Sequence, residues 1–169
     1  MSVALDLGKH AAVDEAEDLK GRYLVSLKFI ERLHRLLLDV IKDEFERLGR
    51  ADVNSVQALL LYNVGDAELT AGELTSRGYY LGSNVSYNLK KLVDAGYINH
   101  QRSTTDRRSV RVRLTEKGQD VCRVVNDLYQ RQLKSLQQVG GLASNDLETL
   151  NKALIRLERF WTDQIRYQL

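Results

Sequence analysis

The sequence contains no proline and only one cysteine in 169 residues. Without proline, helices can run long, and turns must be made with Gly, Asn, Asp and Ser. Cys122 alone cannot form an intramolecular disulfide, which fits a reducing compartment. The N-terminus shows no basic start followed by an apolar run, and no stretch approaches the roughly 18 apolar residues of a membrane span. These absences predict a cytoplasmic protein without a secretory signal or a membrane helix.

The sequence also lacks the motifs of common enzymes. It has no G-x-S-x-G, no phosphate-cradling glycine loop and no histidine–carboxylate spacing suited to acid–base chemistry. His34 and His100 are far apart and form no metal-ligand pattern. We therefore expect no enzymatic activity, no cofactor and no metal site. For His34, beside Leu33, we favour a partly buried histidine over one that lines a binding crevice.

Positive charge is concentrated between Ser83 and Arg113. This stretch has seven basic and two acidic residues, a net charge of +5 in a chain of net +2, so the rest of the chain sums to −3. The basic residues are Lys90, Lys91, Arg102, Arg107, Arg108, Arg111 and Arg113. Concentrated charge of one sign is a first indication of the kind of partner that the protein binds.

A long helix is predicted near the N-terminus. Apolar residues recur at steps of three and four between Glu17 and Leu48, and Gly49 ends the pattern. At 1.5 Å per residue, a helix of about 30 residues is about 45 Å long. It cannot bury its whole apolar stripe in a monomer of this size, so part of it should meet another chain. The preceding residues 1–16 are small, polar and acidic, and we favour a flexible arm over one that grips a partner.

Two more long helices are expected at the C-terminal end. Thr115 caps the first, whose apolar positions continue to Gly140-Gly141, and the second begins near Ser144 with a capping sequence. The apolar residues of the last helix form a narrow seam, as expected for packing against other long helices.

Three short helices are predicted between the long ones. Asp52 or Asn54 caps the first, and Thr70 caps a brief second helix with the capping-box spacing to Glu73. The third runs over about residues 82–95, after a tight turn. This arrangement matches the spacing of a helix-turn-helix.

The third helix has an apolar side and a polar side without acids. Its apolar residues are Val85, Leu89, Leu92 and Val93. No acidic residue occurs between Ser83 and Lys91, and the polar residues are hydrogen-bonding types suited to base edges and phosphates. We favour this interpretation over a helix face that is merely soluble.

A hairpin follows the stop at Gly96. Residues 97–102 alternate weakly, whereas in residues 109–114 the alternation predicts Val110, Val112 and Leu114 inward and Arg111 and Arg113 outward. The tip, STTDRR, carries two adjacent arginines that repel each other. Such a tip makes sense if it meets a polyanion, such as a phosphate backbone or a narrow minor groove.

The run DRRSVRVRLTEKG resembles the wing signature of the MarR family of bacterial winged-helix transcription regulators. Its signature positions are Asp106, Arg108, Val110, Val112, Leu114, Thr115 and Gly118. The preceding SNVSYNLKKLVDAGYI resembles the family's recognition helix and its exit, matched by Leu92, Val93, Gly96, Tyr97 and Ile98. The resemblance covers nearly the whole chain.

The resemblance implies a mainly α fold, a winged helix-turn-helix with a small two- to three-stranded wing sheet and long dimerisation helices. The chain would be one domain, with an arm at 1–16, dimerisation helices at 17–49 and 116–169, and the winged helix-turn-helix at 52–115. The implied function is a sequence-specific transcription regulator, a repressor that occludes a promoter. It would bind a pseudo-palindromic operator in double-stranded DNA as a homodimer. Release by a small aromatic or other effector, bound in the crevice between the long helices and the winged unit, is also implied. A winged-helix module that binds protein instead of DNA is the alternative.

The resemblance also assigns roles to residues. Arg108 would be the minor-groove arginine, and Asp106 would fix the wing through an ion pair. The expected DNA-binding residues are Ser83, Asn84, Ser86, Tyr87, Asn88, Lys90, Lys91, Arg102, Arg107, Arg108 and Arg111. The expected dimerisation residues are Leu19, Tyr23, Leu147, Leu150, Leu154, Leu157, Trp161 and Ile165. Many family members have a small or basic residue in place of Tyr87, so their base preference does not carry over.

Cys122 raises the question of redox sensing, which some family members perform through one cysteine. In the one-cysteine peroxide sensors that residue lies near the first helix, where this chain has none. We therefore favour a small buried hydrophobic residue at Cys122 over a redox sensor.

Overall fold

The computed structural model of the chain describes residues 3–70, 73, 82–102 and 110–167. Side chains are described from residue 15 onward, except those of 82–86, 100–102 and 110 within these ranges. The chain forms two compact units, one that ends at Val125 and one that begins at Asn126, and each is described by itself.

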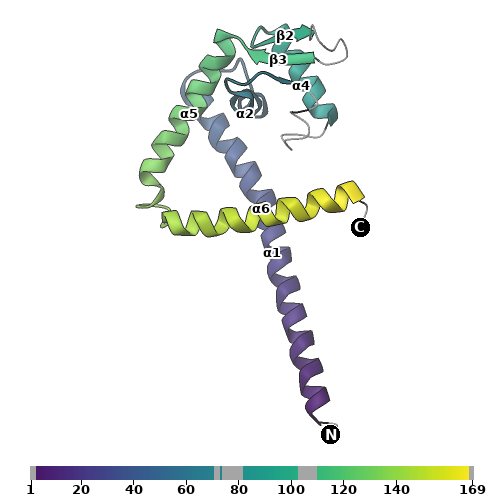
Figure 1. Ribbon diagram of the computed structural model, residues 1–169. Coiled ribbons are helices and arrows are strands. Elements are labelled where there is room, and N and C mark those ends of the chain that lie inside the picture. The colour runs from purple at the N-terminus through teal and green to yellow at the C-terminus, as the bar shows by residue number, and fades with distance from the viewer. Residues whose placement is uncertain (1–2, 71–72, 74–81, 103–109, 168–169) are drawn as a thin grey trace. The chain divides into compact units, whose positions relative to one another are not determined.

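The first unit combines helices with a small antiparallel sheet (Figure 1). Its elements are α1 (Val3–Arg47), α2 (Ser55–Val64), β1 (Leu69–Thr70), α4 (Gly82–Asp94), β2 (Ile98–Arg102), β3 (Val110–Leu114) and the first part of α5 (Glu116–Leu136). The second unit contains the rest of α5 and α6 (Ser144–Tyr167). The predicted mainly α, winged-helix fold class is confirmed.

Helix α1 is longer than the sequence pattern indicates. It has 45 residues and begins at Val3, so residues predicted as an arm have helical backbone. The sequence offers a reason, since Ala, Leu, Glu and Lys are strong helix formers and an existing helix extends at little cost. The predicted end is confirmed, because Gly49 has a φ of 66° and the Arg50 N–H donates to the Phe45 carbonyl at 2.8 Å.

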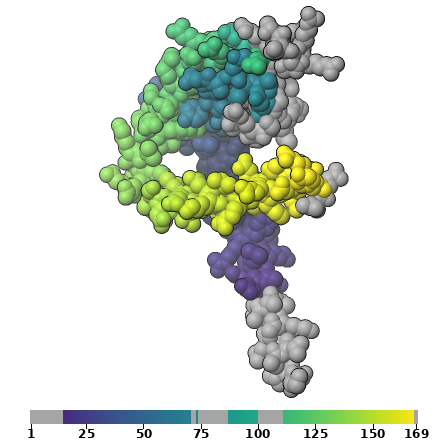
Figure 2. Space-filling view, in the orientation of Figure 1, coloured from purple at the N-terminus to yellow at the C-terminus, as the bar shows by residue number. Residues whose placement is uncertain are grey.

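Among the described side chains of α1, the apolar residues that are fully buried lie near its C-terminal end. Ile41 and Phe45 are buried, whereas Leu19 is 70% and Leu33 is 56% exposed. Of the other elements of the first unit, α2 contacts α1, whose described side chains are coloured from purple to blue in Figure 2. His34 is exposed as well, so the prediction of a partly buried histidine is wrong. The imidazole lies on the exposed part of α1, before the buried Ile41 and Phe45.

Capping interactions start the short helices. Asn54 caps α2, because its side-chain oxygen accepts from the Gln57 N–H while the Gln57 side chain accepts from the Asn54 N–H. The predicted capping box of Thr70 and Glu73 is confirmed by two hydrogen bonds, of 3.1 and 2.6 Å. Apart from Glu73, the helix that it would start lies outside the described residues.

The sheet has the strand order β1-β3-β2, so β3 is central and pairs with both neighbours in antiparallel fashion. Val112 and Leu114 of β3 are 1% and 5% exposed, whereas Arg111 and Arg113 are exposed. The predicted alternation is therefore confirmed for these four residues. One face of the sheet packs on the core, and the other, which we call the outer face, is polar.

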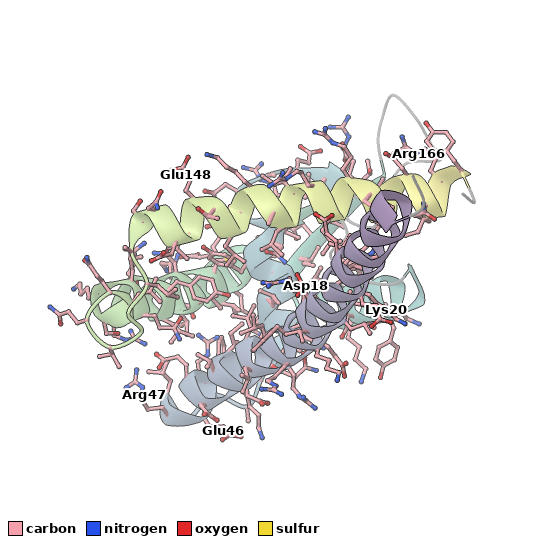
Figure 3. The ribbon with its side chains drawn as sticks, turned by 90° about the horizontal axis from the view of Figure 1, so that it is seen from below. Asp18, Lys20, Glu46, Arg47, Glu148 and Arg166 are labelled. Atoms are coloured by element: carbon pink, nitrogen blue, oxygen red, sulfur yellow. The ribbon has the colours of Figure 1, made fainter. Side chains whose placement is uncertain are left out.

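The long helix of the second unit, α6, differs from the helices of the first unit because none of its residues is buried. It begins at Ser144, close to the predicted position, and the Asp146 carboxylate accepts from the Ala143 N–H at 2.8 Å to close its first turn. Figure 3 shows Glu148 near the start of α6 and Arg166 near its end, the order that the helix dipole favours.

Tyr97 joins the end of α4 to its surroundings. It follows Gly96, which ends α4 with a φ of 78°, and its side chain is 1% exposed. The Tyr97 hydroxyl donates to Asp52, in the loop before α2, and the Tyr97 carbonyl accepts from the Thr115 N–H at 3.0 Å. The Lys117 ammonium lies 4.0 Å from the centre of the Tyr97 ring. One residue thus links α4, the loop before α2 and the start of α5.

Two close contacts complete this junction. Arg50 pairs with Asp120 at 2.7 Å and with Asp52 at 3.3 Å. Gly118 lies so close to Tyr97 that a Cβ at residue 118 would be 2.3 Å from the Tyr97 carbonyl oxygen. Hydrogen bonds from Arg50 and then from Tyr97 lower the pKa of Asp52 to about 2, although partial burial opposes this shift. Burial, and then the bond to Asp52, raises the pKa of Tyr97 to about 12, so its hydroxyl stays a donor.

Replacing Tyr97 by phenylalanine should lower the free energy of unfolding at pH 7 by about 1 kcal/mol, less than the roughly 1.5–3 kcal/mol of a hydrogen bond to a charged group, because Asp52 is partly exposed. The pKa of Asp52 is lower in the folded chain, so this stabilisation is present above the unfolded value of about 4 and is lost as the pH falls towards 2. Urea unfolding of both proteins at pH 7 and at pH 2, where about half of the folded Asp52 is protonated, measures it. Tyr167→Phe, at an exposed tyrosine, is the control, and an equal loss at both pH values would contradict the role of Asp52.

Candidate nucleic-acid interface

One side of helix α4 is apolar and buried, and the opposite side is polar and exposed. Leu89 and Leu92 are 7% and 1% exposed, and they fix which side of the helix faces the core. Tyr87 is 59% exposed, and Lys90 and Lys91 are exposed too. The predicted separation of α4 into two sides is therefore observed. Among the α4 side chains that the structure describes, the exposed ones include two cations, one aromatic ring and, in the last turn, the carboxylate of Asp94.

Tyr87 and Lys91 interact with each other along α4. They are four residues apart, and the Lys91 ammonium lies 4.9 Å from the centre of the Tyr87 ring. An exposed cation–π contact of this kind is worth about 0.5–1 kcal/mol. The pairing restricts both long side chains before any partner arrives, and it keeps a positive charge beside a flat apolar surface. Such a surface can stack on a base or a sugar while the ammonium meets a phosphate.

The other predicted DNA-binding residues are described in part. Asn88 is partly buried and has an interaction partner within the chain. For Ser83, Asn84 and Ser86 on α4, and for Arg102 on β2, the backbone alone is described. Arg107, Arg108 and the wing-stabilising Asp106 lie outside the described residues. Their predicted roles stay predictions.

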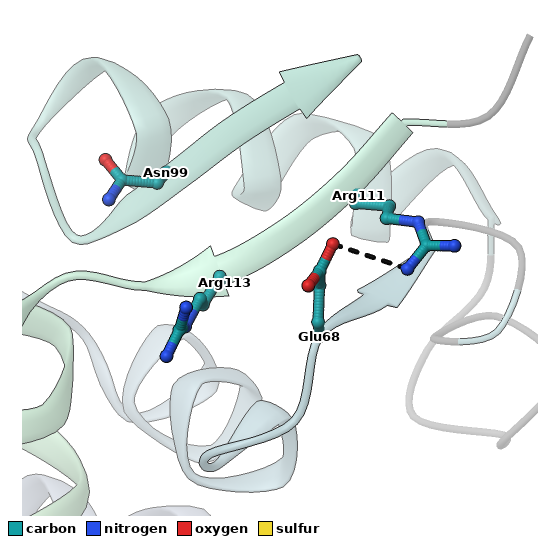
Figure 4. A pocket seen from close by; sticks show the side chains of 4 residues that line it. All are labelled: Glu68, Asn99, Arg111 and Arg113. Carbon is teal, nitrogen blue, oxygen red and sulfur yellow. Dashed lines mark hydrogen bonds and ion pairs between the residues drawn. The ribbon is translucent and has the colours of Figure 1, made fainter. Parts of the chain in front are cut away.

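Arg111 has a partner that the sequence pattern does not reveal. Its guanidinium pairs with the Glu68 carboxylate, at 3.4 Å, across the outer face of the wing sheet. A cavity of about 120 Å³ lies beside this pair, lined by Glu68, Asn99, Arg111 and Arg113 (Figure 4). Arg113 is thus a candidate binding residue that the predicted set omits. The alternation of β3, which places it outward beside Arg111, is the signal that could have identified it.

A second, open cavity of about 550 Å³ lies where the start of α2 meets the end of α4. Asp52, Asn54 and Gln57 line it, but their polar atoms are already used in the Tyr97 junction and the α2 capping box. Lys91 and Asp94 remain as its exposed charged groups. This cavity lies beside α4, so the effector crevice expected along the long helices stays a prediction.

Cys122 has the environment of a structural residue. Its thiol lies 3.2 Å from the Leu61 carbonyl oxygen and is partly buried. Burial, and then the charge of Asp66, raises the pKa of Cys122 to about 11. A thiol with a raised pKa is a poor nucleophile at neutral pH. The environment therefore favours the interpretation of Cys122 as a small, partly buried residue.

In the described part of the chain, the histidines, the cysteine and the carboxylates form no cluster of three or more that could hold a metal ion. Nor does that part contain a helix with the length and apolar character needed to cross a membrane.

Comparison with known proteins gives consistent matches. A family model described as a winged helix DNA-binding domain matches residues 53–118. The chain is 37% identical over 153 residues to the exopolysaccharide II synthesis transcriptional activator ExpG of Rhizobium meliloti (strain 1021), across 90% of this chain and 78% of the relative.

Solved structures show the same fold. A MarR transcriptional regulator from Methanosarcina mazei Go1 is 26% identical with a TM-score of 0.59, over 80% of this chain and 95% of that one. FabT of Streptococcus pneumoniae, solved in complex with DNA, is 22% identical with a TM-score of 0.61, over 83% of this chain and 98% of that one. The relatives named by function are transcription regulators and not enzymes, as the sequence predicts for this chain.

The pKa of Cys122 predicts its reactivity. At pH 8, three units below a pKa of about 11, about one thiol in a thousand is ionised, so iodoacetamide should label Cys122 slowly. The rate should rise about tenfold per pH unit up to pH 11. Intact-mass spectrometry of the folded protein measures labelling, and glutathione in the same solution is the control. Labelling at pH 8 as fast as that of glutathione would restore the redox hypothesis.

Proposed function

Because the chain belongs to the MarR family of winged-helix transcriptional regulators, we propose that it binds specific sequences in double-stranded DNA as a homodimer. Helix α4 enters the major groove of a pseudo-palindromic operator, and the wing arginine Arg108 reaches the adjacent minor groove. The observation that carries this proposal is the exposed surface of Tyr87, Lys90 and Lys91 on a helix whose other side is buried.

The charge distribution supports a DNA partner. The stretch that contains α4 and the wing carries the chain's excess of positive charge. Phosphate contacts by lysine and arginine dominate the affinity of such proteins, whereas hydrogen-bonding and aromatic side chains read the bases. The structure of FabT, which has the same fold, contains DNA. The predicted alternative is a winged helix that binds protein instead of DNA. It does not explain why Tyr87, Lys90 and Lys91 are exposed together on α4.

The exposed apolar side of α6 supports the homodimer. Along the predicted seam, Leu150 is 47%, Leu154 is 40% and Ile165 is 82% exposed. An isolated helix is marginally stable in water, and helices in proteins gain stability chiefly by packing an apolar side. Leu19 and Tyr23 of α1, also predicted at the dimer interface, are 70% and 37% exposed. A second copy of the chain offers the same apolar seams for mutual burial.

The direction of regulation is a separate question. Occlusion of a promoter, the predicted mode, makes the protein a repressor. The relative ExpG is named as an activator, and activation needs DNA binding as well. A cytoplasmic location and release by a small aromatic or other effector remain part of the proposal.

The salt dependence of duplex binding tests the proposal. A titration of the protein with genomic duplex fragments at several salt concentrations should give a log–log slope of about −0.9 per phosphate contact. Fragments that contain the operator should bind at salt concentrations where others do not. Negligible affinity for every duplex even at low salt would overturn the proposal and favour the protein-binding module.

A variant of the wing refines this test. Arg108→Ala should weaken operator binding by about 1–3 kcal/mol, as for one specific contact, without a change in melting temperature. Lys42→Ala, at an exposed lysine of α1, is the control. A fall in melting temperature that matches the loss of affinity would show that Arg108 acts on stability.

Placing a charge in the seam should disrupt the dimer. Leu154→Glu should give monomer or unfolded chain, because an unpaired carboxylate is costly to bury at an apolar interface. Thr149→Glu adds the same charge at an exposed residue of α6 outside the seam and should leave the dimer intact. Sedimentation measures the mass and circular dichroism the folding. An intact Leu154→Glu dimer would contradict this role of the seam.

A further inference from the structure

The outer face of the wing sheet gathers charged and polar side chains from three segments. The antiparallel register places Asn99 of β2 opposite Arg113 of β3, and Thr70 of β1 opposite Arg111. Glu68 comes one residue before β1, so it joins the same face from the other side of β3. Among its described side chains, this face therefore carries two guanidiniums, one amide, one carboxylate and the Thr70 hydroxyl.

The two arginines are not equally satisfied. Figure 4 shows Glu68 between Arg111 and Arg113, with an ion pair to Arg111 alone. That pair is long, 3.4 Å, and both side chains are nearly half exposed. Within the described part of the chain, Arg113 has no carboxylate partner. Since exposed ion pairs contribute little, Glu68 holds Arg111 weakly and leaves Arg113 available.

The size and chemistry of the cavity define what it can bind. At about 120 Å³ it has room for one small oxyanion group with its water, and it is lined by the donors of Asn99, Arg111 and Arg113. A guanidinium presents its N–H groups as a planar fork that matches a carboxylate in a bidentate manner. The oxygens of an incoming carboxylate would find an unpaired guanidinium at Arg113 and an amide at Asn99.

The location of the cavity favours a protein over DNA as the source of that carboxylate or other oxyanion. Val112 and Leu114 point from β3 into the core to which Leu89 and Leu92 of α4 also belong. Arg111 and Arg113 point to the opposite side of the sheet. Arg113 also lies towards the end of β3 that is remote from the wing tip. A duplex held by α4 and the wing tip therefore leaves this face accessible.

We propose that the outer face of the wing sheet, centred on Arg113, binds an acidic segment of a protein partner. A partner carboxylate enters the cavity, pairs with Arg113 and displaces Glu68 from its weak contact with Arg111. This function is additional to DNA binding, because a regulator that is bound to DNA could contact a protein through this surface at the same time. A contact of this kind suits an activator, the role for which the relative ExpG is named.

The test uses the full-length protein and a fluorescein-labelled decapeptide of aspartate and glutamate, with an asparagine–glutamine decapeptide for comparison. Fluorescence anisotropy measures binding of each peptide and, separately, of a DNA duplex. Arg113→Gln should weaken binding of the acidic peptide about tenfold, as for one charge-assisted contact, and change duplex binding less than about twofold. Glu68→Gln should strengthen peptide binding, because it removes the competing carboxylate.

Matched variants on α1 control for net charge. Lys42 and Glu46 form an exposed ion pair there, at 3.6 Å, so Lys42→Gln and Glu46→Gln change the charge by the same amounts away from the sheet. The proposal is overturned if these variants alter peptide binding as much as Arg113→Gln and Glu68→Gln do, or if the acidic peptide binds no better than the neutral one. If Arg113→Gln weakens duplex and peptide equally, the face is a DNA contact and the protein partner is excluded. Failure of the wild-type protein to bind any duplex contradicts the DNA-binding function separately, since the peptide arm does not depend on it.

Discussion

The buried Tyr97 side chain is the constraint on which the winged unit depends. Its hydroxyl reaches the loop before α2, its ring lies under Lys117, and its carbonyl accepts from the backbone at the start of α5. A helix that reads DNA must be held at a fixed angle to the elements around it, because small displacements move side chains out of reach of base edges. By anchoring the residue that follows α4, Tyr97 converts a short helix into a rigid support for Tyr87, Lys90 and Lys91.

Local patterns in the sequence predict the elements well, because their causes are local. Gly96 ends α4, Asn54 and Thr70 form capping boxes, and the alternation of β3 separates Val112 from Arg113. Helix α1 begins at Val3, whereas the sequence predicts a flexible arm there. The missing apolar stripe argues against burial of these residues, but it does not prevent them from forming a helix.

Long-range pairs could not be predicted from one sequence. Arg50 meets Asp120 at a separation of 70 residues, and Glu68 meets Arg111 at a separation of 43. Nothing in the local pattern around these residues identifies the partner. The sequence therefore predicts which residues could bind a partner, but it does not predict which of them already form ion pairs within the chain. The structure identifies these pairs. Arg111 is paired with Glu68, so the charge count from Ser83 to Arg113 overstates the number of unpaired cations.

Gly118, the last residue of the wing signature, has a structural role of its own. Two backbones approach so closely at this residue that any side chain on it would collide with the Tyr97 carbonyl. Substitution by alanine would force the first turn of α5 away from the backbone of Tyr97, and with it the Thr115 hydroxyl that bridges the Gly96 carbonyl and the Gly118 N–H. The last residue of a motif known from DNA-binding proteins is therefore required first by the close contact between the start of α5 and the backbone of Tyr97. A search for this motif selects for the geometry of that contact, whatever the protein binds.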